Sequence, residues 1–392
     1  MDTSPSPSGP GVLTPRSVEE ARELLMASRP VLARGAGTKW AMADPPSGAW
    51  LMDMRQLAGI VEYEPAEFTV TARAGTPLRT LVELLASHGQ YLPFDPPFVE
   101  AGATVGGAVA SALSGPGRLR FGGVRDFVLG IRFLDGEGRL VRGGGKVVKN
   151  AAGFDLPKLF CGSRGRLGVI VEVTLKVFPA PRAFGTVVVS LDTVEEAAAA
   201  LRDLARSPLE PHAVDLVPPE AVAGGWERAD RPLAPSASRP PTTLLVRVGG
   251  SPDALDAWIG RMEARLGRRG LRLHGEAEAA LWVRLRDLRW LPPAWRLIRL
   301  HLVPSLLSRA ERTLGRLGAV RHYSVAGNVG WAAVPSEADW GELVRALQAL
   351  GAPAMAMRGA PPGGVWVVAP PGEAFARRVK QALDPGQRFG PL

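Results

Sequence analysis

Three glycine-rich segments of this 392-residue chain combine small residues with the polar groups that could hold an anionic ligand. The first reads Arg34-Gly35-Ala36-Gly37-Thr38 and follows an apolar stretch over residues 31–33. Consecutive backbone N–H groups in such a turn form an anion-binding concavity suited to a pyrophosphate. The Arg34 guanidinium would add positive charge and Thr38 a hydroxyl. A surface salt bridge is the ordinary alternative for Arg34.

The other two segments can approach a flat ligand closely because they lack bulk. Residues 101–115 carry no charge and are too short and glycine-rich to span a bilayer, which favours close backbone packing around a large planar group. Residues 162–168 contain three glycines and run into 169–178, whose alternation predicts a half-buried strand. A simple tight connection is the alternative explanation for that turn.

The elements that must position these segments belong to an α+β fold. Before residue 95, periodicity predicts a helix over 18–28, a strand over 31–34 and a helix that begins at Pro77. The sequence Pro179-Ala180-Pro181 marks a domain boundary. A β–α pattern then predicts a ferredoxin-like domain, with strands over 185–191 and 243–248, helices over 193–205 and 253–266, and a last helix over 373–383.

Composition is that of a globular protein, with 46% hydrophobic and 22% charged residues. Cys161 is the single cysteine, so this chain alone forms neither an intrachain disulfide nor a multi-cysteine iron–sulfur site. Residues 1–11 are polar and lack basic residues, which predicts a disordered tail and not a signal peptide. We therefore expect a cytoplasmic protein that contacts the inner face of the membrane only indirectly, through partner subunits.

In their order, the three glycine-rich segments resemble the flavin domain of the vanillyl-alcohol-oxidase/p-cresol-methylhydroxylase (PCMH-type) superfamily. Residues 60–78, 122–130 and 149–156 are similar to the family of E subunits of glycolate oxidases. The resemblance is specific over about residues 12–183 and returns near 383–391. It implies a two-lobed PCMH-type FAD-binding domain over 12–182 (lobes 12–95 and 96–182), a reduced ferredoxin-like α+β cap over 183–345, and a C-terminal segment, 346–392, that returns toward the flavin domain.

In that superfamily the first loop holds the FAD pyrophosphate, the second segment lines the cofactor, and the third covers it. The resemblance assigns FAD contacts to Arg34, Gly35, Ala36, Gly37, Thr38, Pro97, Ala103, Thr104, Gly106, Gly107, Ala110, Ser114, Gly115, Gly165, Arg166, Leu167, Gly168, Val169 and Ile170. Related proteins that tether FAD covalently use a His or Cys in corresponding loops. The first loop here has neither, and none of the five histidines falls in a flavin motif, so non-covalent FAD is expected.

Fewer residues are candidates for catalysis than for FAD binding. Lys149 and Asn150 could stabilise negative charge on a reduced flavin, although Asn150 could equally cap a turn. Hydroxy-acid dehydrogenases of the superfamily carry a metal-binding His-x-Gly-Asp-Gly-Asn-x-His pattern, of which this chain keeps only His322 and Asn328 in a loose form. A core histidine is the ordinary alternative, and no metal site is expected.

Net charge does not indicate a nucleic-acid partner. Residues 261–321 hold 14 arginines and five acidic residues, which equals the whole net charge of +9. This segment also holds Trp282, Trp290 and Trp295, a composition typical of interfaces but also of a helix packed on a core. A docking face for an acidic partner, a field that attracts anionic hydroxy acids, and a solvated surface all remain open.

The combined prediction is an FAD-binding subunit of a glycolate oxidase- or dehydrogenase-type complex. Its partners would be a larger flavoprotein subunit and an iron–sulfur subunit, and the complex would oxidise the small 2-hydroxy acid glycolate to glyoxylate. Two alternatives remain: a stand-alone FAD-dependent 2-hydroxy-acid oxidase or dehydrogenase, and a structural subunit with a vestigial flavin site.

Overall fold

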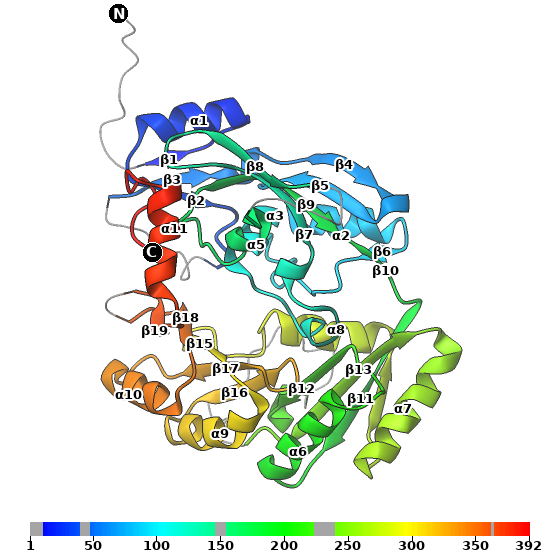
Figure 1. The fold of residues 1–392 in the computed structure, drawn as a ribbon. Coiled ribbons are helices and arrows are strands. Elements are labelled where there is room, and N and C mark those ends of the chain that lie inside the picture. Colours follow the sequence, from blue (N-terminus) through cyan, green and yellow to red (C-terminus); the bar gives the residue numbers. More distant parts are fainter. Residues whose placement is uncertain (1–10, 40–47, 146–153, 223–239, 362–363) are drawn as a thin grey trace, which may run out of the picture. The chain divides into compact units, whose positions relative to one another are not determined.

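The computed structural model describes residues 11–39, 48–145, 154–222, 240–361 and 364–392. The chain divides into two compact units, drawn in Figure 1. The first unit comprises residues 1–114, 123–180 and 371–392, and the second comprises 115–122 and 181–370. The predicted tail over 1–11 lies outside the described residues except for Gly11, whose carbonyl accepts a hydrogen bond from Leu51 N.

A small parallel sheet opens the first unit. Its strand order is β1 (Val12–Leu13), β3 (Trp50–Asp53), β2 (Val31–Arg34). Helix α1 (Val18–Ala27) begins where the Ser17 hydroxyl accepts a hydrogen bond from Glu20 N. Leu25 of this helix packs with Val31 and Met52 in one apolar cluster. This packing fixes strand β2, which ends at the predicted anion loop.

The second sheet of this unit is antiparallel and has the order β4 (Ile60–Glu64), β5 (Thr69–Arg73), β9 (Val169–Lys176), β7 (Val128–Leu134), β8 (Leu140–Gly144). Strands from before and after residue 95 therefore share one sheet. The predicted division into lobes 12–95 and 96–182 was wrong, because β5 pairs with β9 over residues 69–73 and 172–176. A hydrogen bond between the Thr71 and Thr174 hydroxyls joins these two strands at 2.9 Å.

Short helices complete the first unit. They are α2 (Leu78–Ala86), which follows Pro77, α3 (Val105–Ser111) and α5 (Leu156–Phe160), and β6 (Gln90–Tyr91) pairs with β10 (Phe178–Pro179). Helix α3 lies in the segment for which the sequence predicted only close packing. The last helix, α11 (Glu373–Leu383), matches its predicted range.

The second unit contains a nine-stranded sheet built from two similar halves. The first half follows the chain as β11 (Ala183–Ser190), α6 (Val194–Ala205), β12 (Ala213–Val217), β13 (Thr243–Gly250), α7 (Pro252–Leu266) and β14 (Leu271–His274). Its spatial order, β14-β11-β13-β12, is that of a ferredoxin-like β-α-β-β-α-β unit. The sequence predicted β11, α6, β13 and α7 of this half, but not β12 or β14.

The second half repeats the arrangement with β15 (Arg296–His301), α9 (Leu307–Arg316), β16 (Val320–Ser324), β17 (Val329–Val334), α10 (Trp340–Leu350) and β18 (Ala354–Arg358). The halves join where β12 pairs with β16, and β19 (Trp366–Val368) follows β18 at the edge. The second unit therefore runs to Pro370, beyond the limit of 345 expected for the cap. The reason is that β18 pairs with β15 and so belongs to this sheet.

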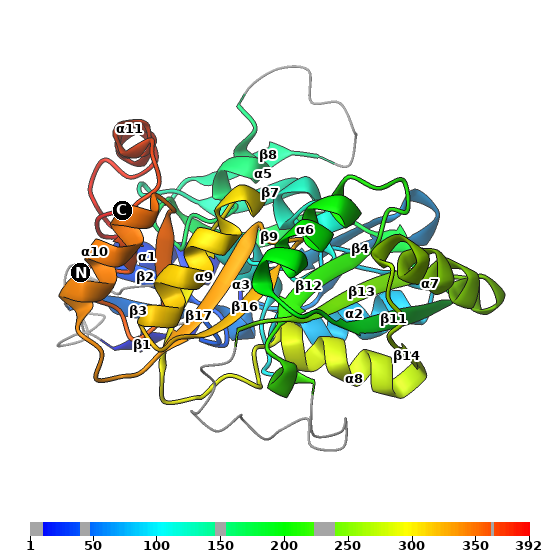
Figure 2. The same cartoon turned by 90° about the horizontal axis from the view of Figure 1, so that it is seen from below.

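The two faces of the nine-stranded sheet differ in character. Helices α6, α7, α9 and α10 cover one face, and α8 (Gly275–Arg286) lies on the other (Figures 1 and 2). Val187 and Val189 on β11 join the apolar core under the four helices. Thr186, which precedes Val187 on the strand, points to the opposite face and bonds with Glu278 and Trp282 of α8. Polar side chains thus alternate with core residues along the strands.

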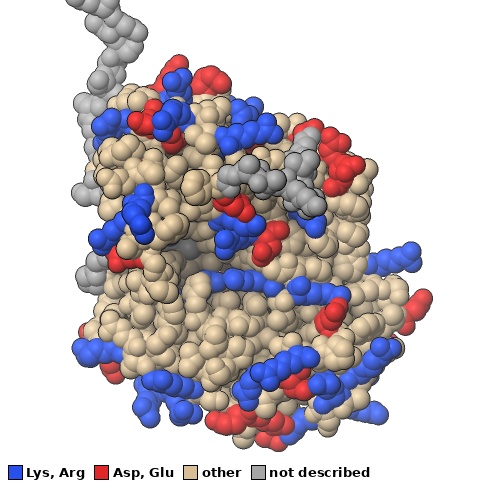
Figure 3. Space-filling view, in the orientation of Figure 1, with Lys and Arg blue, Asp and Glu red and all other residues tan. Residues whose placement is uncertain are grey.

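The arginine-rich segment 261–321 is partly buried, and part of its charge is paired within the second unit. Trp282 and Trp290 are 3% and 0% exposed, so they belong to the interior. Several of the arginines form ion pairs within the unit, such as Arg265 with Asp203 and Arg272 with Glu263. On the face drawn in Figure 3, basic and acidic side chains intermingle around α6 and α7. The burial of Trp282 and Trp290 therefore favours tryptophans packed in a core over an interface of exposed tryptophans.

Candidate functional site

The predicted anion loop lines the principal hollow of the first unit. The hollow has an empty volume of about 540 Å³. Three segments that are distant in sequence meet there: the loop after β2, the start of α3 and the turn before β9. Its lining residues are Ala33, Arg34, Gly35, Ala36, Gly37, Thr38, Lys39, Thr104, Gly107, Ala110, Ser111, Arg164 and Gly165. A second hollow of about 370 Å³ shares part of this wall and adds Met54, Ala74, Gly106, Gly168 and Ile170.

Glycine is required at specific points of this wall. A Cβ atom on Gly35 would lie 2.2 Å from Thr104 Oγ1, and one on Gly106 would lie 2.7 Å from the Ala74 Cβ. Gly37 and Gly165 have positive φ angles of 73° and 76°, which favour glycine. The backbone therefore forms the surface of the hollow, and its N–H groups can reach a ligand.

Thr104 joins the first two segments. Its hydroxyl accepts a hydrogen bond from Gly107 N at 3.3 Å and so caps helix α3. The same hydroxyl approaches Gly35 closely enough to exclude any larger residue there. The start of α3 and the anion loop are thus held against each other, and both belong to the wall of the hollow.

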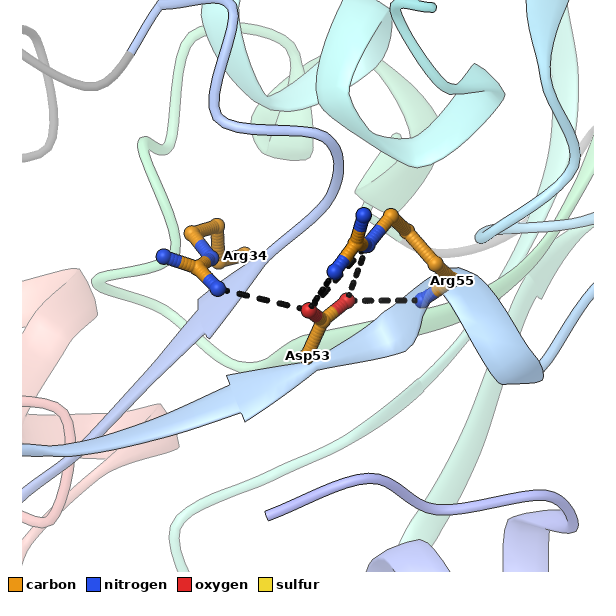
Figure 4. A network of polar contacts seen from close by, with 3 residues as sticks. All are labelled: Arg34, Asp53 and Arg55. Atoms are coloured by element: carbon orange, nitrogen blue, oxygen red, sulfur yellow. Dashed lines mark hydrogen bonds and ion pairs between the residues drawn. The ribbon is translucent and has the colours of Figure 1, made fainter. Parts of the chain in front are cut away.

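An aspartate that the sequence analysis missed orients Arg34. Asp53, at the end of β3, accepts a hydrogen bond from Arg34 Nη2 at 3.3 Å and from Arg55 Nε at 2.9 Å and Nη2 at 2.6 Å (Figure 4). Burial raises the pKa of the Asp53 carboxyl, but the hydrogen bonds from Arg55 and Arg34 outweigh it and leave that pKa below its usual value. Because β2 and β3 are adjacent and parallel, Arg34 and Asp53 are partners in register. Only the strand pairing could have revealed this contact.

The turn over residues 162–168 is bonded to α3 through its backbone. Gly162 N donates to Val109 O at 3.0 Å, and Arg164 N donates to Ala110 O at 2.8 Å. The Arg166 side chain is only 3% exposed and donates to Phe389 O at 3.1 Å, so it binds the C-terminal segment instead of lining the hollow. The backbone contacts expected for this turn are compatible with the geometry, and the FAD contact expected for Arg166 stays a prediction for its backbone.

Other predicted FAD contacts lie away from the lining. Pro97, Ala103, Leu167 and Val169 are buried in the first unit but do not line either hollow. Ser114 Oγ accepts a hydrogen bond from Val124 N at 3.0 Å. Gly115 belongs to the second unit, so its assignment to the flavin domain was wrong.

The weak catalytic candidates do not form one site. Lys149 and Asn150 lie outside the described residues. His322 is 1% exposed, and its Nε2 lies 2.8 Å from Oδ2 of the fully buried Asp215. The Asn328 side chain donates to Val325 O. These contacts fit the core interpretation of His322, although its buried Nδ1 has no hydrogen-bond partner in the described part of the chain.

Across the described ranges, no group of three or more His, Cys, Asp or Glu side chains is placed to hold a metal ion. Nor does any helix in those ranges have the length and apolarity required to cross a membrane.

Known proteins that bind FAD are similar in sequence to the part of the chain that contributes the first two segments of the hollow. The family model described as FAD binding domain matches residues 10–144. Glycolate oxidase subunit GlcE of Escherichia coli is 46% identical over 166 residues, which is 42% of this chain and 47% of that protein. Glycolate oxidase subunit GlcD of Bacillus subtilis is 26% identical over 260 residues, and D-lactate dehydrogenase of Archaeoglobus fulgidus is 30% identical over 218 residues. These matches cover 64% and 55% of this chain, and 54% and 48% of the relatives. The chain thus spans about half the length of these relatives.

Solved structures show how far the fold extends. A crystal structure of p-cresol methylhydroxylase with substrate bound aligns with a TM-score of 0.72 at 15% identity, covering 98% of this chain and 88% of that one. Alkyldihydroxyacetonephosphate synthase aligns with a TM-score of 0.69 at 18% identity, covering 96% of this chain and 76% of that one. Both units therefore share a fold with these proteins. The FAD model covers the loop after β2 and helix α3 of the hollow, whereas the turn before β9 lies outside the matched residues. Residues 10–144 therefore match the FAD binding domain family, in a chain that shares its fold with p-cresol methylhydroxylase.

Proposed function

We propose that the chain is the FAD-binding subunit of a glycolate oxidase- or dehydrogenase-type complex. The observation that carries this proposal is the hollow in which Arg34, Gly35 and Gly37 meet Thr104 and Gly165. Its backbone donors and Arg34 suit a pyrophosphate, and its small side chains suit the rest of an FAD molecule. The identity of 46% to a glycolate oxidase subunit supports the choice of complex.

Within the proposed site, this chain's own residues would hold and orient the cofactor. Loop residues 34–38 would bind the pyrophosphate, with Arg34 held in place by Asp53. Residues 104–110 and the turn over 162–168 would enclose the remainder, excluding water by close backbone approach. Bound FAD supplies the ability to take two electrons from a 2-hydroxy acid and release them singly. We infer that the flavin is non-covalent, since the lining of both hollows contains neither His nor Cys.

The partners belong to the same proposal. A larger flavoprotein subunit would oxidise glycolate to glyoxylate, and an iron–sulfur subunit would carry the electrons away. The single cysteine of this chain supports an external iron–sulfur carrier. A location at the inner face of the membrane, reached through those partners, is part of the proposal.

Co-expression with the genes of the two expected partners tests this assignment. A tagged form of this chain should retain both partners, and glycolate oxidation should require all three chains. Arg34→Met should reduce flavin content and activity together, whereas the exposed Arg312→Met should leave both unchanged. Glycolate turnover by this chain alone would instead identify a stand-alone oxidase. Full activity of a complex whose copy of this chain is flavin-free would identify a structural subunit.

A further inference from the structure

Strand β14 forms one edge of the nine-stranded sheet, at the side of the second unit where α7 and α8 lie (Figure 2). It pairs with β11 in antiparallel register. In such a pair only alternate residues bond to the neighbouring strand, so the other N–H and C=O groups of β14 point outward. Among the described residues, no backbone group of another segment bonds to them. An edge of this kind can pair with a further strand.

The features that usually protect a sheet edge do not cover β14. Its four residues include neither proline nor lysine, and its register with β11 has no bulge. Arg272 does not shield the edge, because its guanidinium is bonded to Glu263 and Asp256 of α7. Leu271 is 56% exposed. The shortness of the strand favours pairing with one matching strand over open-ended association.

A hollow beside β14 lies on the same face of the sheet as α8. Its empty volume is about 870 Å³, and its lining residues are Val188, Ser190, Arg268, Arg269, Gly270 and Leu271. Val187 of β11 belongs to the core under the four helices, so the side chain of Val188 points to the face that bears α8. Arg269 is exposed and forms no ion pair with the described residues. The hollow thus contains a guanidinium that no carboxylate of the described chain binds.

Glu276 supplies the opposite charge at the other end of β14. It is the second residue of α8, which begins directly after β14. Its side chain is exposed and, within the described residues, forms no ion pair. Arg269 lies two residues before β14 and Glu276 two residues after it. The two charges are therefore equally far along the chain from the centre of the strand, which lies between Arg272 and Leu273.

Two copies of β14 can pair in antiparallel fashion about that centre. A two-fold axis perpendicular to the sheet relates such strands, so the faces that bear α8 would lie on the same side in both copies. In this register Arg272 comes opposite Leu273 of the second copy, and no two like charges face each other across the strands. Arg269 of each copy comes opposite Glu276 of the other, on the face that holds the hollow.

We propose that the chain forms a symmetric homodimer through its second unit. The two β14 strands pair, and Glu276 of each copy binds Arg269 of the other at the hollow. The contact joins charges that each chain by itself leaves without an ion pair, and the symmetry forms both ion pairs at once. The dimer depends neither on FAD nor on the partners proposed above, because all of its contacts belong to the second unit.

Light scattering during size-exclusion chromatography of the purified full-length chain tests this dimer. The native chain should be a dimer. Arg269→Glu and Glu276→Arg should each raise its dissociation constant by about 10- to 100-fold, because like charges then meet at both ends of the contact. An equimolar mixture of the two variants should dimerise like the native chain, since both contacts of a mixed dimer again join opposite charges. Arg316→Glu, which reverses an exposed charge on α9, is the matched control and should dimerise like the native chain.

Flavin content separates a loss of dimerisation from misfolding and from loss of the FAD site, because it should be the same in all these variants. A native chain that stays monomeric at its highest soluble concentration would overturn the proposal. Native-like dimerisation of both single variants, or a mixture of them that stays monomeric, would do the same. If the native chain is monomeric and co-expressed partners slow hydrogen exchange in β14, the edge binds a different protein and the choice of a second copy is wrong.

Discussion

Asp53 is the carboxylate that holds Arg34, the positively charged residue at the start of the proposed pyrophosphate loop. It holds Arg34 and Arg55 together at the end of two parallel strands, and its side chain is only 4% exposed. The loop itself is backbone, so Arg34 is the side chain that brings fixed positive charge to it, with Lys39 at its far end. Removing Asp53 should leave the glycine geometry intact and release Arg34.

Asp53→Asn should destabilise the chain in a pH-dependent manner. The folded pKa of Asp53 lies below its unfolded value of about 3.9, so its contribution is fully present above that pH. The contribution is lost as the pH falls through the folded pKa. The difference in unfolding free energy between the native chain and Asp53→Asn should therefore be constant from pH 7 to 5 and shrink below about 4. Denaturant unfolding at four pH values measures it, with the exposed Asp253→Asn as control. A difference that grows on acidification would contradict the assignment.

Gly35→Ala should impair FAD binding through a single methyl group. The new Cβ would meet Thr104 Oγ1 at 2.2 Å, so either the loop or the cap of α3 must move. We expect FAD affinity to fall by more than about tenfold, which corresponds to 1.4 kcal/mol. Fluorescence titration of the flavin-free protein with FAD measures the change. Gly250→Ala, where a Cβ meets nothing within 4 Å, is the control. Equal FAD affinity in the two variants would mean that the loop is not part of the site.

At the scale of elements, the C-terminal segment holds together the parts that carry the site. Arg388 is 1% exposed and donates to the carbonyls of Leu25, Ser28 and Gly136. Lys380 donates to Arg166 O at 2.7 Å and pairs with the buried Asp384. These contacts connect α1, the β7–β8 turn and the turn before β9.

Arg388→Met should therefore cost about 3 kcal/mol or more, because several buried carbonyls lose their donor. Denaturant unfolding gives this value, and FAD affinity should fall in the same variant because Val31 N of strand β2 donates to Arg388 O in this region. Arg378→Met, exposed on α11, should leave both quantities unchanged. Unaltered stability of Arg388→Met would show that the segment does not hold the first unit together.

The sequence predicted the helices and strands whose apolar residues recur at a regular spacing. It missed the features that depend on which strands pair with each other. Strand β2 and helix α11 match their predicted ranges because apolar residues recur there at strand and helix spacing. The five-stranded sheet was divided wrongly, since no local pattern indicates that β5 lies beside β9. The second ferredoxin-like half was missed as a unit for the same reason. Within the site, the glycine positions could be predicted from the sequence. The hydrogen bond between Arg34 and Asp53 and the one from Arg166 to Phe389 O could not, because they join residues that are far apart in the sequence.

At the scale of the whole molecule, the two units carry different parts of the account. The first holds the glycine-lined hollow, and the second is built on the nine-stranded sheet of two ferredoxin-like halves. Substitutions in the hollow, such as Gly35→Ala, should therefore affect flavin binding without unfolding the second unit.

The flavin content of the purified full-length chain tests the central claim most directly. We predict an absorption spectrum of oxidised flavin and close to one FAD per chain after reconstitution, all of it released into the supernatant by acid precipitation, because no His or Cys lines either hollow. A folded, colourless chain that fails to bind added FAD would contradict the proposed site, and flavin that stays in the acid pellet would contradict its non-covalent attachment.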